Sequence, residues 1–186
     1  MILRASLDLA DERGLAAVTM GAVADRLGVT PMALYRHVGN KADLLDAIVE
    51  SLLMEIAVPD ARLPWRQRLA AVARAARDSA RRHPDVFPLL LQRAANTPGG
   101  RRVRDAVCAA LRDAGLPDDQ VLRVERLLST FVMGFAVSEA SGRFATRAVE
   151  VEADFNYLQN LVFDLIEQAP ARDRNASRGR SGRQRG

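Results

Sequence analysis

The side chains best suited to bind another molecule lie close together, in the stretch VTMGAVADRLGVTPMALYRHVGNK at residues 18–41. Apolar residues recur at helical spacing on both sides of Gly28, with Val23, Ala24 and Leu27 before it and Leu34 and Val38 after it. Glycine accepts the left-handed backbone of a tight turn at little cost, and the small Ala24 lets a second helix approach closely. The spacing therefore predicts a helix-turn-helix.

The second of these helices would present a run of exposed side chains around its start and outer side. Thr30 is the expected N-cap, and Pro31 takes the first helical position, where its missing N–H costs nothing. The exposed residues are then Pro31, Met32, Ala33, Tyr35, Arg36 and His37. A short helix of this kind can enter the major groove of double-stranded DNA.

The same stretch resembles a known family. The pattern TxxxVAxxLGVxxxxLYxHVxNKxxLL, which runs from Thr19 to Leu45, is similar to the DNA-binding domain of tetracycline-repressor-like (TetR family) transcriptional regulators. The similarity covers residues 2–57, whereas over 58–170 it consists only of helix number and order. The resemblance implies a homodimeric repressor that leaves a palindromic operator when a small molecule binds.

Residues 30–33 are the candidates for reading base sequence. Thr30 offers a hydroxyl, and Met32 and Ala33 offer apolar contact with thymine methyl groups. The alternative is that this segment is only a solvent-exposed turn. Gly21 departs from the family pattern, which often has a long polar or basic side chain there, so we expect no base or phosphate contact from that position.

Five further residues are candidates for contacts with DNA. Thr19 would cap the first helix of the pair and lie near amides that point outward. Lys41 opens the next helix, where its charge opposes the dipole, so a phosphate held by Lys41 and the exposed amides would remove that conflict. The resemblance favours a phosphate contact for Tyr35 and a DNA contact for His37. The alternatives are a half-buried Tyr35 and a solvated surface position for Arg36, His37 or Lys41.

No set of residues predicts catalysis or metal binding. The single cysteine, Cys108, lies among Ala and Val with no histidine nearby in sequence, so we expect a buried, inert thiol. His83 precedes Pro84 at the C-terminal end of a helix. We expect it to act there as a cation that the helix dipole stabilises rather than as a metal ligand. Two histidines and one cysteine make no metal-ligand cluster, and there is no glycine-rich phosphate loop. We expect no enzymatic activity, no cofactor and no metal.

Charge is distributed unevenly along the chain. Residues 1–50 hold five basic and seven acidic side chains, so bulk charge alone would not predict DNA binding. The Arg-rich segment 169–186 is too polar to fold, and we expect a disordered tail that either has no dedicated role or adds attraction to phosphates. The longest mainly apolar run, 127–138, is too short to span a bilayer, and one cysteine makes no internal disulfide. We expect a cytoplasmic protein with no membrane partner.

Helical patterns fill the remaining sequence, so the predicted fold class is all-α. A three-helix helix-turn-helix domain at 1–57 would be followed by a helical domain for effector binding and dimerisation at 58–168, because Pro59 and Pro64 break the pattern between them. An amphipathic helix at 2–14 opens the chain, and a helix at 41–57 links the two domains. Further helices are predicted at 65–83, 85–95, 101–114, 118–142 and 149–168, with a loop at 97–100.

The second domain would contain a cavity and a dimer interface. Unless they only fill the core, six apolar residues are the expected cavity walls: Trp65, Phe87, Leu90, Leu91, Met133 and Phe144. Stripes on the last two helices would pair with a second protomer as a four-helix interface, through Val124, Leu128, Phe131, Phe135, Phe155, Leu158, Val162 and Leu165. Val72 and Ala76 occur where tetracycline recognition would want polar or aromatic groups, so we do not expect tetracycline as the effector.

These residues together predict a DNA-binding transcriptional regulator, a repressor by family expectation, that a small-molecule effector releases from its operator. The alternative is a helical carrier or interaction protein whose helix-turn-helix no longer binds DNA. Gly21 and the acidic first domain keep that alternative open.

Overall fold

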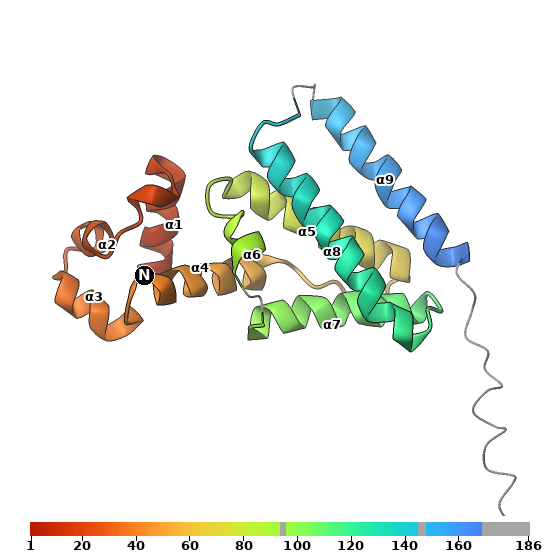
Figure 1. Ribbon diagram of the computed structural model, residues 1–186, viewed down its shortest axis with the longest axis horizontal. Helices are drawn as coiled ribbons and strands as arrows, with labels where there is room; N and C mark the ends of the chain where they lie inside the picture. The colour runs from red at the N-terminus through yellow and green to blue at the C-terminus, as the bar shows by residue number, and fades with distance from the viewer. Residues whose placement is uncertain (94–95, 145–147, 169–186) are drawn as a thin grey trace, which may run out of the picture.

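The computed structural model describes residues 1–93, 96–144 and 148–168, and within these ranges the chain is all-helical, which confirms the predicted fold class (Figure 1). The α-helices are α1 (Ile2–Arg13), α2 (Met20–Leu27), α3 (Pro31–Val38), α4 (Lys41–Glu55), α5 (Trp65–Arg82), α6 (Leu89–Gln92), α7 (Pro98–Asp113), α8 (Asp118–Ala140) and α9 (Ala148–Gln168). A short 3-10 turn, η1 (Leu15–Ala17), follows α1. None of the described helices is both long enough and apolar enough to cross a membrane.

The first three helices gather at one end of the molecule, and α4 runs from them into the larger body formed by α5–α9 (Figure 1). One apolar core extends through both parts, from Leu9 of α1 to Ala136 of α8. In α4, Leu44, Ile48 and Leu52 are fully buried in this core. The helix α4 packs against the first three helices at one end and against the larger body at the other. A shift in the larger body can therefore move the first three helices.

The predicted loop at 97–100 and the predicted helix at 85–95 are both wrong. Thr97 Oγ1 accepts a hydrogen bond from the Gly100 N–H at 3.2 Å, so Pro98 occupies the first position of α7 and the helix begins three residues early. Among the described residues of the shorter segment, Leu89–Gln92 alone are helical, and turns occupy the residues before them. The predicted disordered tail, 169–186, lies outside the described residues.

Gly99 allows α7 to approach α4 closely. Its N–H donates to Glu50 Oε1 at 2.8 Å, and a Cβ added at position 99 would lie 2.9 Å from Glu50 Oε2 and 3.1 Å from the Leu53 Cβ. We expect Gly99→Ala to lower the free energy of unfolding, because Glu50 is held by the Gly99 amide and Leu53 is buried. Chemical denaturation measures this directly.

Gly21 provides the matched control for that substitution. A Cβ added at Gly21 would meet no atom within 4 Å. Because alanine is favoured over glycine in helices by about 0.5–1 kcal/mol, Gly21→Ala should stabilise the protein while Gly99→Ala destabilises it. Stabilisation by both substitutions would show that the contact between α4 and α7 tolerates a methyl group.

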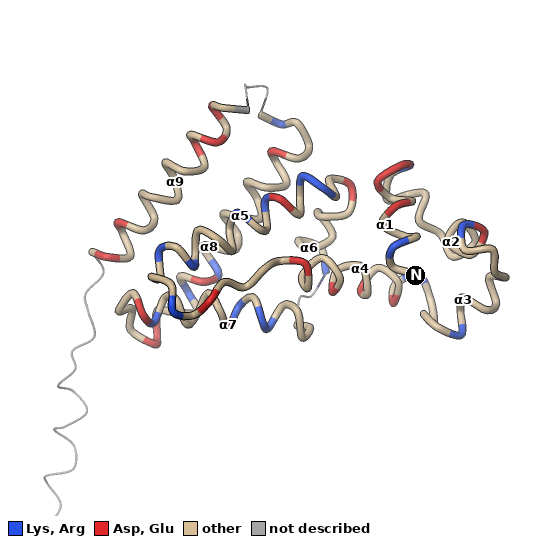
Figure 2. Tube along the Cα trace, turned by 180° about the vertical axis from the view of Figure 1, so that it is seen from behind, with Lys and Arg blue, Asp and Glu red and all other residues tan. Residues whose placement is uncertain are grey.

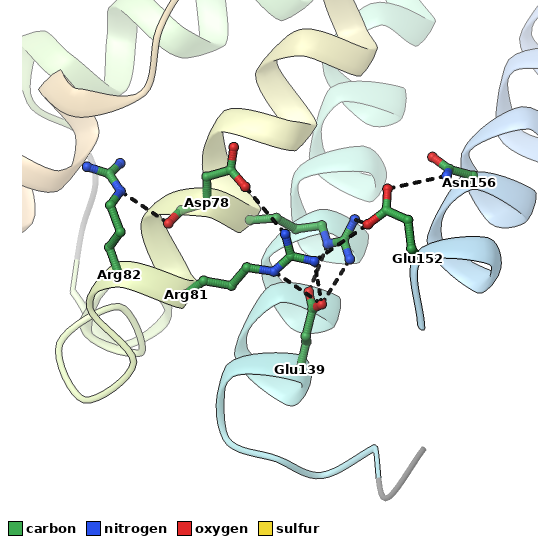
Figure 3. A network of polar contacts seen from close by, with 7 residues as sticks. Asp78, Arg81, Arg82, Glu139, Glu152 and Asn156 are labelled. Atoms are coloured by element: carbon green, nitrogen blue, oxygen red, sulfur yellow. Dashed lines mark hydrogen bonds and ion pairs between the residues drawn. The ribbon is translucent and has the colours of Figure 1, made fainter. Parts of the chain in front are cut away.

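A buried arginine joins the three longest helices of the body. Arg77 of α5 is 2% exposed, and its guanidinium donates to both carboxylate oxygens of Glu139 at 2.8 and 2.9 Å and to Glu152 at 3.0 Å. Figure 3 shows Glu139 and Arg81 together on one side of this network and Glu152 on the other. The Arg77 guanidinium carbon also lies 4.1 Å from the ring centroid of Phe155. This network fixes α8 and α9 relative to α5.

Candidate nucleic-acid interface and effector cavity

The turn between α2 and α3 has the predicted geometry. Gly28 adopts a left-handed backbone with φ 67°, and the Val29 N–H donates to the Ala24 carbonyl at 3.0 Å. Thr19 Oγ1 accepts from the Ala22 N–H at 3.1 Å, and Thr30 Oγ1 accepts from the Ala33 N–H at 3.3 Å. Both threonines therefore cap their helices, and the cap at Thr30 sets where α3 begins.

The outer side of α3 is exposed to solvent. Leu34 turns inward and is 1% exposed, while Met32 is 66% and Tyr35 45% exposed. Thr30, Pro31, Arg36 and His37 are exposed as well, and Ala33 is half-buried. The residues from Thr30 to His37 that were predicted to touch DNA are therefore exposed, apart from the half-buried Ala33.

Lys41 is exposed at the first position of α4, but the amides beside it are already bonded. Asn40 Oδ1 accepts hydrogen bonds from the Ala42 and Asp43 N–H groups at 2.7 and 3.1 Å. The prediction that a phosphate would share these amides with Lys41 is therefore wrong for Ala42 and Asp43. Any anion bound here would depend mainly on the Lys41 ammonium group.

Basic side chains near α3 that already pair with a carboxylate are less available to bind a phosphate. Arg26 of α2 makes two hydrogen bonds to Glu12 of α1, at 2.5 and 2.7 Å, and these bonds hold the pKa of Glu12 below its ordinary value. In the described part of the chain, no carboxylate lies within ion-pair distance of Arg36 or Lys41. Figure 2 shows that basic residues are sparse over α2 and α3. These two cations are thus the ones free to meet a phosphate.

Side chains from the larger body hold α4 along its whole length. Arg93 donates to Asp46 and to the Ala42 carbonyl at the start of α4. Arg102 of α7 donates to three carbonyl oxygens at the other end, those of Leu53, Met54 and Ile56, at 2.7–3.1 Å. Neither arginine was predicted from the sequence, because their partners are about fifty residues away and no local pattern marks them.

His83 adds a further contact between the two parts of the molecule. Its Nδ1 lies 2.9 Å from an Asp11 carboxylate oxygen of α1, and its side chain is 15% exposed. His83 lies at the C-terminal end of α5, as predicted, and its contact with Asp11 also links that end to α1. Cys108 is buried, and burial raises the pKa of its thiol, as expected of an unreactive cysteine.

A cavity of about 540 Å³ lies within the larger body and has walls from α4 to α9. This volume is in the range of sites that bind drug-sized molecules. Leu53 and Ile56 of α4 and Gly100 and Val103 of α7 contribute to its lining. A molecule in the cavity would therefore touch the same two helices that Glu50 and Arg102 join.

Half of the predicted cavity residues line it. Leu90, Leu91 and Met133 do so. Trp65 instead packs edge-on against Phe163, with ring centroids 5.4 Å apart, and Phe144 packs against Phe135 at 5.0 Å. Phe87 is fully buried in the core. These three assignments were wrong because large apolar residues serve packing as readily as they line a cavity.

Most of the residues predicted for the dimer interface are used inside the protomer. The Phe131 and Phe155 rings stack at 6.0 Å and, with Leu128 and Val162, line the cavity. Phe135 packs on Phe155. Two more lie partly inward, since Val124 packs against the second apolar cluster and Leu158 is half-buried. Leu165 is the exception at 59% exposed, and other apolar residues of α8 and α9 are exposed as well: Leu122, Leu127, Tyr157 and Leu161.

Comparison with protein-family models matches the two parts of the chain separately. Residues 2–48 match the model of bacterial regulatory proteins of the tetR family, and residues 58–164 match the tetracyclin repressor-like C-terminal domain. The chain is 35% identical over 146 residues to the tetracycline repressor protein class A of Escherichia coli, a match that covers 76% of this chain and 66% of that repressor. The chain thus spans slightly less than two thirds of that relative.

Solved structures share the fold over nearly the full chain. BioQ, whose crystal structure contains its double-stranded DNA operator, is 30% identical with a TM-score of 0.76, over 90% of this chain and 96% of BioQ. Apo ActR from Streptomyces coelicolor is 25% identical with a TM-score of 0.78, over 90% of this chain and 93% of ActR.

Proposed function

The chain belongs to the tetR family of bacterial regulatory proteins, and from this premise we propose that it is a transcriptional repressor that a small molecule releases from a palindromic operator. The observation that carries the proposal is the exposed outer side of α3, where Met32 and Tyr35 project beyond a helix-turn-helix that both threonine caps hold in place. BioQ, a similar protein, has been crystallised with its DNA operator.

Residues 1–57 would bind DNA, and residues 58–168 would bind the effector and form the dimer. Thr30, Pro31, Met32 and Ala33 would meet base edges. Phosphates would be contacted by Thr19, Tyr35, Arg36, His37 and Lys41. Two copies of α3 would enter successive major grooves, about 34–36 Å apart.

Effector binding would act through α4. A molecule in the cavity would press on Leu53 and Ile56, and the hydrogen bonds from Gly99 and Arg102 would transmit the movement of α7 to the same helix. The spacing of the two α3 helices would then no longer match the DNA grooves. A coupling of about 1–3 kcal/mol would lower operator affinity roughly 5–150-fold.

The dimer would form through the outward faces of α8 and α9. Leu127 is 66% and Leu161 45% exposed, and a Cβ added at Gly134 would meet no atom within 4 Å, which leaves room for a partner helix. We expect Leu161→Arg to give monomers by light scattering with the helical content unchanged. Leu63→Arg, at a residue 41% exposed outside these helices, is the control that should stay dimeric. If the Leu161→Arg variant stayed dimeric, the outward faces of α8 and α9 would not form the dimer interface.

Selection of bound fragments from a random DNA pool, followed by mobility-shift titration at several salt concentrations, tests the function. If the dimer neutralises about six to eight phosphates, log K should fall with log salt at a slope near −5 to −7. Enrichment of a palindrome with such a slope supports a repressor. Absent or salt-insensitive binding supports a helical carrier instead.

A further inference from the structure

The lining of the effector cavity is mainly apolar and includes six polar side chains. The six are Arg104, Glu125, Arg126, Ser129, Thr130 and Gln159. The Ser129 and Thr130 hydroxyls donate to the Arg126 carbonyl at 3.1 and 2.7 Å, so those protons are engaged within α8. Glu125 is the only carboxylate among the lining residues that the structure describes.

Glu125 is half-buried, and no described residue compensates its carboxylate for the water that it loses. No hydrogen bond or ion pair joins its carboxylate to any described residue, and Arg104, which also lines the cavity, lies beyond ion-pair distance. Burial raises the pKa of Glu125, against the opposing influence of Arg104 and Arg126. The cavity thus disfavours the charged carboxylate, and an unpaired charge in such a place is costly unless something pairs with it.

We propose that Glu125 anchors a positively charged nitrogen on an otherwise apolar effector. The apolar part would lie against Leu69, Val72 and Phe131, while an ammonium group donates to the Glu125 carboxylate. The attraction between opposite charges is stronger at a partly buried site such as this one than in open water. Arg126 is exposed and Arg104 is half-buried, as Glu125 is, but neither arginine could replace Glu125 as the anchor, because a guanidinium group repels an ammonium group. This inference rests on the proposed function, since it takes the cavity to be the effector site.

Three probes with one apolar body and different heads test the inference: 4-biphenylmethylamine, 4-biphenylmethanol and biphenyl-4-carboxylate. In calorimetric titrations of the full chain without DNA, we expect the amine to bind about tenfold or more tightly than the alcohol, and the carboxylate to bind most weakly. Glu125→Gln should reduce the preference for the amine to about twofold or less and leave the affinity for the alcohol unchanged. The unchanged alcohol affinity would also show that this variant folds.

Two further variants locate the effect. Arg104→Gln should keep or increase the preference for the amine, and Val72→Phe, which fills the cavity, should abolish binding of all three probes. Equal affinity for amine and alcohol, tighter binding of the carboxylate, persistence of the preference in Glu125→Gln, or no binding of any probe would each overturn the inference. Mobility shifts on the selected DNA, run in parallel without probes, report the proposed function separately from this result.

Discussion

Replacing Lys41 by alanine is expected to weaken DNA binding about 100-fold or more, to a similar degree for every sequence. The dimer would lose two phosphate contacts, and a hydrogen bond from a charged group contributes about 1.5–3 kcal/mol. Because the neighbouring Ala42 and Asp43 amides are bonded to Asn40, neither of them can substitute for the lost ammonium. The slope of log K against log salt should become shallower by about 2.

Matched variants separate a phosphate contact from a general loss of charge. Lys41→Arg should retain most of the affinity and the slope. Arg4→Ala removes a cation that is paired with Asp8 on α1, and it should change neither the affinity for DNA nor the salt slope. Met32→Ala should instead alter base preference more than overall affinity. An unchanged salt slope in Lys41→Ala would place the phosphate contacts elsewhere.

Replacing Arg77 by methionine is expected to lower the free energy of unfolding by about 1.5–3 kcal/mol, because Glu139 and Glu152 lose their buried partner and keep the more exposed Arg81. Burial raises the pKa of Glu139, but hydrogen bonds from Arg77 and Arg81 outweigh it and hold that pKa below its ordinary value. Urea denaturation of both proteins at pH 7 measures the difference.

The pH dependence of this difference is a second test of the network. A carboxyl whose pKa is lowered by folding stabilises the protein above its unfolded pKa, about 4.3 for Glu, and loses that contribution as the pH falls through the folded pKa. The gap between wild type and Arg77→Met should therefore shrink below about pH 4. The matched control is Arg62→Met, whose exposed pair with Asp60 should have little effect at any pH. A gap independent of pH would mean that Arg77 acts through packing alone.

The helix-turn-helix could be predicted because its signals are local. Threonine caps, a proline at the first helical position and a glycine in the turn each act within four residues, and the structure places all of them as expected. The same signals, Thr97 followed by Pro98, also mark the start of α7. The two glycines that follow nevertheless favour a loop, because glycine in a helix is unfavourable unless a close contact such as that of Gly99 with α4 requires it.

A cavity with Leu90, Leu91 and Met133 in its lining could be predicted, but the rest of the lining and the contacts that hold α4 could not, because they depend on which helix faces meet. Phe155 looked suited to a dimer interface from its stripe alone, yet its ring packs on Phe131 within the chain. Glu125 and Arg102 have no local pattern to distinguish them from solvated charges. Their roles follow only from burial and from partners far along the chain.

Site-specific crosslinking tests most directly whether α3 reads DNA. A photoreactive side chain would replace Met32, and in a control protein it would replace Asp154, an exposed residue of α9. On the selected palindromic operator, the variant at position 32 should crosslink to bases in both half-sites, one helical turn apart, and the control should not crosslink. Crosslinking from position 154 but not from position 32, or no crosslink in either half-site, would contradict the proposal that this surface docks in the major groove.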